Sequence, residues 1–105
     1  GGGLSNIARM NPSVGFQIEL SEQAWRENIF SEDFRFVMEK GQIAFEEMMK
    51  TFNGGVGLVL SIENDEKTMT AVKEHLRKQG QEYFDLGQVV DEHTGIVKLD
   101  NYSFS

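Results

Sequence analysis

The order of apolar and polar residues predicts helices and strands along most of the chain. Residues 45–52 carry apolar side chains at positions i, i+3, i+4 and i+7, the spacing of one buried stripe on a helix over about residues 42–52. Residues 53–55, Asn-Gly-Gly, predict a chain reversal because these residue types adopt positive φ at low cost. Residues 56–62 are almost continuously apolar, which predicts a strand buried on both faces.

The flanking segments predict further elements. Residues 14–20 alternate between apolar and polar, which predicts a strand with one solvated face. Ser31 is a predicted N-cap for a helix over residues 32–40, and Asn64 or Asp65 is one for a helix over residues 66–79. The side chains expected to face the core from these two helices are Phe34, Val37, Met38, Met69, Val72 and Leu76.

The ends of the chain give shorter signals. The pattern predicts a short helix over residues 4–10, and a helical turn after Ser21 that buries Trp25. Residues 83–90 and 96–99 are predicted as two strands of a hairpin, joined by a five-residue loop. Residues 101–105 show no pattern. This order of elements predicts an α+β fold, a layered α/β sandwich in which helices pack on a mixed sheet, as a single domain over residues 1–105.

Composition excludes several classes of protein. The chain has no Cys and two His, which argues against a disulfide framework and against a zinc site. Its net charge of −7 argues against a nucleic-acid surface, because such a surface needs clustered Lys and Arg. No apolar run reaches the length of a membrane span, so we expect a cytoplasmic protein without a membrane partner.

Three glycines open the chain, and two interpretations of them stay open. They are either the remnant of a purification tag or the start of a phosphate site. Free backbone N–H groups at the start of a helix attract phosphate, because they lie at the positive end of the helix dipole. A single phosphate is compatible with an acidic protein, since distant charges are screened beyond about 8–10 Å.

Two strings of residues resemble one enzyme family. EEMMKTFNGGVG, residues 46–57, resembles the signature EM..TFN.G.G of the aminoimidazole ribonucleotide synthetase family, whose members are also called phosphoribosylformylglycinamidine cyclo-ligases. GGGLSNIAR, residues 1–9, resembles the TGGG…N…R segment of that family, and Trp25 with Phe30 resembles its W…P.IF segment. Ala8 stands where the family commonly has Pro, and Gly54 where it has a larger apolar residue.

The resemblance implies a function for a longer enzyme. Family members carry a dimer-forming N-terminal domain and an SSG.HSNG motif, and neither is in this sequence. The chain is therefore expected to be the second half of the C-terminal domain, inactive when isolated. The implied reaction is ATP-dependent ring closure of formylglycinamidine ribonucleotide to aminoimidazole ribonucleotide in purine biosynthesis. ATP and Mg²⁺ would bind mainly outside this chain, and the full-length enzyme would be a homodimer.

The same resemblance suggests which residues position the phosphorylated ribonucleotide substrate, while it identifies neither a catalytic residue nor a metal ligand. The residues expected to hold the ribose phosphate are Gly1, Gly2 and Gly3, assisted by Asn6 or Arg9, and those expected to form the opposing wall are Asn53, Gly55 and Gly57. For the second group a purely structural role, a helix cap and close packing, is an equal alternative.

Two other functions compete with this interpretation. The first is another ATP-dependent enzyme of the same fold superfamily, such as formylglycinamidine ribonucleotide synthetase, thiamine-monophosphate kinase or selenophosphate synthetase. The second is a free-standing binding or interaction module without catalysis, particularly if the three opening glycines are a tag remnant. An open sheet edge or a bare apolar face would favour the truncated enzyme and predicts that the chain self-associates.

Overall fold

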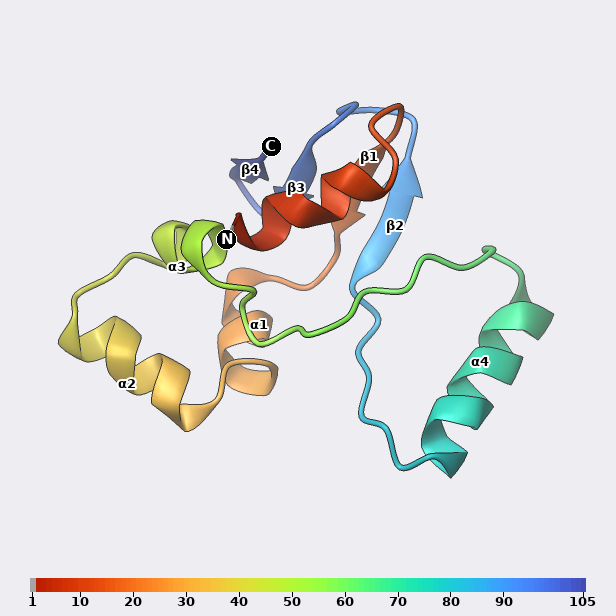
Figure 1. The fold of residues 1–105 in the computed structure, drawn as a ribbon, viewed down its shortest axis with the longest axis horizontal. Helices are drawn as coiled ribbons and strands as arrows, with labels where there is room; N and C mark the ends of the chain where they lie inside the picture. Colours follow the sequence, from red (N-terminus) through yellow and green to blue (C-terminus); the bar gives the residue numbers. More distant parts are fainter. Residues whose placement is uncertain (1) are drawn as a thin grey trace.

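A four-stranded mixed sheet lies at the centre of the computed structural model, which describes residues 2–105 (Figure 1). The strands are β1 (Gly15–Ile18), β2 (Gly87–Val90), β3 (Val97–Leu99) and β4 (Tyr102–Phe104), in the order β2-β1-β3-β4. β1 pairs antiparallel with β2 and parallel with β3, and β3 pairs antiparallel with β4. Helices pack against this sheet, which confirms the predicted α+β class and the mixed sheet.

The predicted hairpin between residues 83–90 and 96–99 is wrong, because β1 lies between β2 and β3. The connecting loop crosses the start of β1, where the Gly95 N–H donates to the Val14 carbonyl over 2.9 Å. This arrangement gives β1, whose residues are mostly buried, a hydrogen-bonded neighbour on each side. A simple hairpin would satisfy local spacing but would leave the apolar β1 with one unpaired edge.

The C-terminal segment, which lacks a recognisable sequence pattern, is ordered as strand β4. A tight turn at Asp100, whose φ of 50° is left-handed, reverses the chain after β3. Val97 then lies opposite Phe104, and Leu99 lies opposite Tyr102. Phe104 is 2% exposed, so the last strand closes one side of the core. Three residues are too few for the alternation of a strand to be read from sequence.

Four helical segments precede or flank the core: η1 (Gly3–Met10, a 3₁₀-helix), α1 (Glu22–Asn28), α2 (Glu32–Lys40) and α3 (Phe45–Thr51). Ser21 and Ser31 act as N-caps, as predicted, since their hydroxyl oxygens accept hydrogen bonds from the N–H groups of Ala24 and Phe34. Three residues per turn in η1 place Leu4 and Ile7 on one row, and both are buried. The predicted helices therefore form, with boundaries shifted by up to a few residues.

The core is formed by side chains from η1, the sheet, α1 and α3. Trp25 is fully buried, as predicted, and the stripe of α3 is buried at Phe45, Met48 and Met49. α2 contributes less than expected, because Met38 is buried whereas Val37 is 47% exposed. The other members of the buried cluster are Leu4, Ile7, Ala8, Phe16, Ile18, Phe30, Val97, Leu99 and Phe104.

The strand predicted over residues 56–62 is absent. The segment is extended but belongs to no sheet. Val56 and Val59 contact the edge of the core, whereas Leu58 and Leu60 are 78% and 56% exposed. Its sequence is suited to a buried strand, but a strand forms only when a neighbour pairs with its N–H and C=O groups. No described residue supplies that neighbour.

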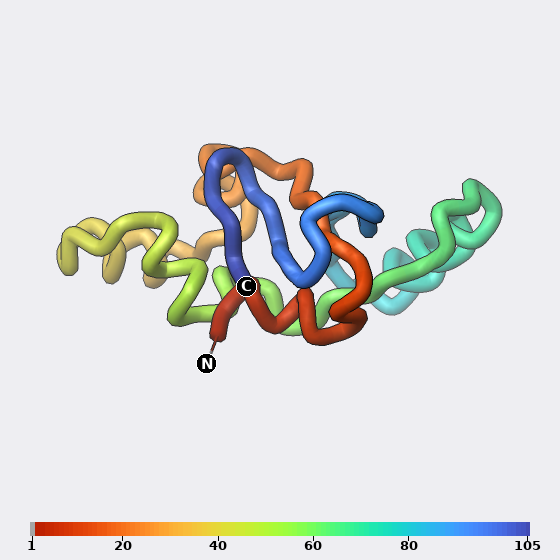
Figure 2. The backbone as a smooth tube through the Cα atoms, turned by 90° about the horizontal axis from the view of Figure 1, so that it is seen from above, coloured from red at the N-terminus to blue at the C-terminus, as the bar shows by residue number. Residues whose placement is uncertain are grey.

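Helix α4 (Glu66–Lys78) follows this segment and lies apart from the sheet, at one end of an elongated molecule of 44 × 33 × 22 Å (Figure 2). Asp65 caps it, as predicted. The stripe of Met69, Val72 and Leu76 was predicted to be buried, but no residue of α4 is buried. None of these three side chains packs against the core cluster. No helix formed by residues 2–105 is long and apolar enough to cross a membrane.

Candidate functional site

The start of η1 contains two of the glycines predicted to bind phosphate, while Gly1 lies outside the described residues. Gly2 has left-handed backbone angles, φ 96° and ψ −14°, and its carbonyl accepts hydrogen bonds from the Ser5 N–H and hydroxyl. A Cβ atom at Gly2 would lie 3.1 Å from the side-chain oxygen of Asn6. The structure therefore places the Asn6 side chain beside the turn that starts η1.

Gly3 is held against the end of α3. Its φ is 53°, and a Cβ atom there would lie 1.9 Å from the carbonyl oxygen of Met49 and 2.7 Å from that of Phe52. Both distances are far below any normal contact, so no residue with a side chain fits at this position. The need for glycine at Gly3 is thus explained by packing alone.

Asn6 and Arg9 lie on the exposed side of η1. Residues three apart align along a 3₁₀-helix, so these two side chains form a row on one face. Arg9 is in the last turn, where a cation complements the helix dipole. Asn6 thus lies beside the glycine turn, and Arg9 adds a positive charge one helical turn further along η1, on a chain whose overall charge is negative.

The second predicted group forms a tight corner after α3. The Asn53 side-chain oxygen accepts a hydrogen bond from the Gly55 N–H over 3.0 Å, and Gly54 and Gly55 have φ of 66° and 91°. The Gly54 carbonyl accepts a buried hydrogen bond of 2.8 Å from the Trp25 indole. A Cβ atom at Gly55 would lie 2.8 Å from the Ile29 carbonyl oxygen. The close packing that the sequence left open is therefore present at this corner, whereas the Asn53 side chain bonds Gly55 and the C-cap residue of α3 is Phe52.

The structure brings most of the two predicted groups to one end of α3. Gly3 contacts the Phe52 carbonyl, and Asn53 is the next residue along the chain. Gly57 is different: it is exposed, its φ is not left-handed, and a Cβ atom there would meet nothing within 4 Å. Nothing among residues 2–105 requires glycine at position 57.

A polar cluster beside the sheet was not predicted. The Tyr102 hydroxyl donates to the Glu22 carboxylate over 2.6 Å, and Arg26 forms an ion pair with the same carboxylate. The hydrogen bond to Glu22 is the main cause of a raised pKa at Tyr102. Arg26 also stacks over the Phe45 ring at 5.5 Å. The spacing of Glu22 and Arg26 at i, i+4 was a readable signal, whereas the contact with Tyr102 depends on β4, which was missed.

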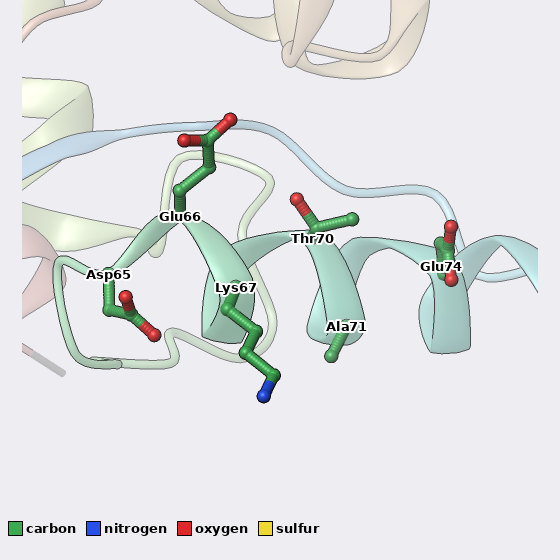
Figure 3. Close-up of a pocket in the computed structure, with 6 residues that line it drawn as sticks. All are labelled: Asp65, Glu66, Lys67, Thr70, Ala71 and Glu74. Carbon is green, nitrogen blue, oxygen red and sulfur yellow. The ribbon is translucent and has the colours of Figure 1, made fainter.

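A shallow hollow runs along α4, away from the glycine segments (Figure 3). Its lining residues are Asp65, Glu66, Lys67, Thr70, Ala71 and Glu74. The side chains of Asp65 and Lys67 point to one side of the helix, and those of Glu66 and Thr70 point to the other. They do not converge on a common point. Within residues 2–105, no three His, Asp or Glu side chains gather as a metal site would require.

Comparisons with known proteins agree with this chain's two signature strings. The model of the family described as AIR synthase related protein, C-terminal domain, matches residues 1–100. The chain is 35% identical over 89 residues to the phosphoribosylformylglycinamidine cyclo-ligase of Bacillus pumilus, covering 85% of this chain and 24% of that protein. It is 36% identical over 104 residues to the enzyme of the same name from Thermococcus kodakarensis, covering 97% of this chain and 26% of that protein.

The same comparisons define the extent of the similarity. The match to the cyclo-ligase of Clostridium perfringens, 36% identical over 89 residues, covers 25% of that protein. The chain thus spans about a quarter of the length of these curated relatives. No solved structure matches it.

Proposed function

Since the chain belongs to the AIR synthase-related family, whose C-terminal domain model matches residues 1–100, we propose that it is the second half of that domain and positions the substrate of an ATP-dependent cyclo-ligase. The substrate would be formylglycinamidine ribonucleotide, and the product aminoimidazole ribonucleotide, a step of purine biosynthesis. The relatives named as cyclo-ligases support this choice over other ATP-dependent enzymes of the superfamily.

The reaction needs a rigid hold on the substrate. The amide oxygen is a poor leaving group, so a phosphoryl group from ATP would first be transferred to it. The neighbouring nitrogen would then attack the activated carbon, form the ring and release phosphate. Such chemistry depends on positioning and on cations that neutralise the phosphates. The described residues offer no carboxylate cluster for Mg²⁺. We therefore propose that ATP and Mg²⁺ bind mainly outside these 105 residues.

The observation that carries the proposal is the packing of the start of η1 against the end of α3. The left-handed Gly2 turn, the Asn6 side chain and the Asn53 corner lie near the C-terminal end of α3. Gly2 and Gly3 would hold the ribose phosphate, assisted by Asn6 or Arg9, and Gly1, which lies outside the described residues, belongs to the same group in the proposal. Asn53 and Gly55 would form the opposing wall. We include Gly57 in the proposed wall, as predicted from the sequence.

Binding of the substrate to this chain tests the proposal. Arg9→Ala should weaken the binding of formylglycinamidine ribonucleotide by about tenfold or more in isothermal titration calorimetry, because a charged hydrogen bond to phosphate contributes about 1.5–3 kcal/mol. Asn6→Ala should have a smaller effect in the same direction. Arg77→Ala, on the exposed face of α4, is the matched control. Equal affinities of Arg9→Ala and wild type would contradict the phosphate assignment.

We also propose that the 105 residues alone do not catalyse ring closure. The chain spans about a quarter of the length of its relatives, so the proposed ATP and Mg²⁺ sites would be missing. The measurement is phosphate release in the presence of ATP, Mg²⁺ and substrate, with a full-length relative as the positive control. Turnover by the chain alone would contradict this proposal. We propose that the full-length enzyme is a cytoplasmic homodimer. In that enzyme, replacing Gly2 with a bulky residue should raise the KM for formylglycinamidine ribonucleotide.

A further inference from the structure

We propose that Asn53 is a site of spontaneous deamidation, at which the corner after α3 converts a side-chain amide into a carboxylate. The starting observation is the pair Asn53-Gly54, the single place in the sequence where Gly follows Asn. The backbone nitrogen of the residue after an Asn attacks the Asn side chain and closes a ring. A side chain on that residue obstructs the attack, and Gly has none. Asn53 is exposed, so water reaches its amide.

The attacking nitrogen is not engaged elsewhere in the corner. The Asn53 carbonyl accepts a hydrogen bond of 3.2 Å from the Val56 N–H, and Gly54 and Gly55 both have positive φ. These features are typical of a tight turn of type I′. Within residues 2–105, the Gly54 N–H donates no backbone hydrogen bond. Its proton is therefore not held by an acceptor when the nitrogen has to release it.

The next N–H along the turn activates the amide that is attacked. The Gly55 N–H donates to Asn53 Oδ1 over 3.0 Å, an ordinary hydrogen-bond length. When the Gly54 nitrogen bonds to Cγ of Asn53, the carbonyl double bond becomes single and Oδ1 becomes negatively charged. A donor already aimed at that oxygen stabilises the developing charge, as the N–H groups of an oxyanion hole do. The corner thus supplies both the nucleophile and the stabilising donor.

The reaction consumes water and needs no other reactant. The Gly54 nitrogen forms a bond to Asn53 Cγ, and the bond between Cγ and the amide nitrogen breaks. That nitrogen receives, through water, the proton that the Gly54 nitrogen loses, and it leaves as ammonia. Water then adds to one of the two carbonyl carbons of the cyclic imide and breaks the bond from that carbon to the Gly54 nitrogen. No atom is oxidised or reduced.

The two directions of ring opening affect the fold differently. Opening at Cγ gives Asp, whose carboxylate can still accept from the Gly55 N–H. Opening at the backbone carbonyl gives isoaspartate, in which the main chain passes through Cβ and Cγ and is one methylene longer. Gly54 has little room to move, since a Cβ atom on it would lie 2.7 Å from Met49 Cε. Isoaspartate therefore displaces the Gly54 carbonyl from the buried Trp25 indole, now 2.8 Å away, and leaves that N–H unpaired.

Mass spectrometry of the chain after incubation at neutral and at mildly alkaline pH tests the proposal. Cleavage after lysine releases residues 51–67, which contain Asn53 and, as an internal control, the exposed Asn64. Asp65 follows Asn64, and its side chain obstructs ring closure. Asn53 should therefore lose its amide first and give a mixture of Asp and isoaspartate. The loss should be faster at the higher pH, because the attacking nitrogen must release a proton.

A parallel incubation in guanidinium chloride gives the rate without the corner. Asn53 that stays intact in the folded chain while it deamidates in the unfolded chain would overturn the proposal, because the corner would then protect the amide. Equal rates at Asn53 and Asn64 in the folded chain would overturn it as well.

Two variants separate the reaction from its effect on the fold. Asn53→Ser keeps an oxygen that can accept from the Gly55 N–H but has no amide, so its midpoint of urea denaturation should stay constant during incubation. Asn53→Asp, measured fresh, represents the product with a normal backbone and should unfold close to fresh wild type. Incubated wild type should unfold at a lower urea concentration, in proportion to its isoaspartate content. An unchanged midpoint at high isoaspartate content would overturn the proposed effect on the Trp25 bond.

Discussion

The indole Nε1 of Trp25 donates a hydrogen bond of 2.8 Å to the carbonyl oxygen of Gly54. This bond joins the middle of α1 to the corner that follows α3, two segments separated by 29 positions in the sequence. The Trp25 side chain is fully buried, and the Gly54 corner packs on it and on Met49. The position of Asn53 and Gly55, which we propose as one wall of the substrate site, therefore depends on a core residue.

Trp25→Phe should lower the free energy of unfolding by about 1–3 kcal/mol. The substitution leaves the Gly54 carbonyl buried without its donor and creates a small cavity. The measurement is urea denaturation followed by far-UV circular dichroism, because Trp25 is the single Trp of the chain and its fluorescence is lost. Gln23→Ala, on the exposed face of the same helix, should change stability by less than about 0.5 kcal/mol.

Gly3→Ala should be far more destabilising than Gly2→Ala. The Cβ atom at position 3 would overlap the Met49 carbonyl oxygen, whereas the one at position 2 would meet mainly the movable side chain of Asn6. We expect losses of more than about 4 kcal/mol for Gly3→Ala and about 1–3 kcal/mol for Gly2→Ala, the latter from the cost of a left-handed residue. Thermal unfolding of the two variants tests this order. Similar losses would mean that η1 does not pack closely on α3.

The helix content of α4 should depend on pH through Asp65. This carboxylate accepts hydrogen bonds from the Thr68 N–H and hydroxyl, and the hydroxyl bond is the main cause of its lowered pKa. A lowered pKa stabilises the helix above the unfolded value of about 3.9, and the effect is lost as pH falls through the folded pKa. Circular dichroism should therefore show less helix in Asp65→Ala than in wild type at pH 7, and a smaller difference at pH 2.

Asp65→Asn separates the charge from the cap. Asn also accepts a hydrogen bond at the N-cap, so this variant should retain most of the helix at pH 7. Its helix content should change less than that of wild type between pH 5 and pH 2. A wild-type profile identical to that of Asp65→Asn would show that another group controls the transition.

The Tyr102 hydroxyl should stabilise the fold below about pH 10 and lose this effect at higher pH. Its hydrogen bond to Glu22 raises its pKa, so the folded state keeps the proton after the unfolded chain has released it. Stability should then fall as pH rises from about 10 through the raised pKa. Urea denaturation of wild type and Tyr102→Phe at pH 8 and pH 11 measures the effect. The difference between the two proteins should shrink at pH 11, and a constant difference would contradict the assignment.

Local sequence signals predicted the helices well, because their causes are local. Ser21, Ser31 and Asp65 cap the helices for which they were chosen, and the stripe of α3 is buried at three of its four positions. Strand neighbours were predicted poorly. The position of β1 between β2 and β3 depends on contacts distant in sequence, which neither spacing nor alternation records. At residues 56–62 the sequence pattern predicted a strand that does not form. The pattern is suited to a buried strand, but it cannot supply the neighbouring strand with which the segment would have to pair.

The candidate site was predictable in part. Sequence singled out the glycines at the start of η1 and the corner after α3, and the structure brings Gly3 and Phe52 into contact. The sequence did not reveal that a Cβ atom at Gly3 would collide with the Met49 carbonyl oxygen, or that one at Gly55 would collide with the Ile29 carbonyl oxygen. Steric need and ligand binding select the same residue, so glycine alone does not distinguish them. Arg9, whose side chain is exposed and whose residue type is not needed for a close backbone approach, therefore gives the sharper test of the site.

The parallel pairing of β1 with β3 sets an order of events during synthesis. Phe16 leaves the ribosome well before its neighbour Val97, because most of the described residues lie between them in the sequence. At about 5–20 residues per second, the nascent chain spends several seconds with β1 unpaired and with the uncharged segment 56–62 already outside the ribosome. The sheet closes only after Leu99 and Phe104 emerge. Chaperones that bind extended apolar segments would therefore meet residues 56–62 before this sheet and its core exist.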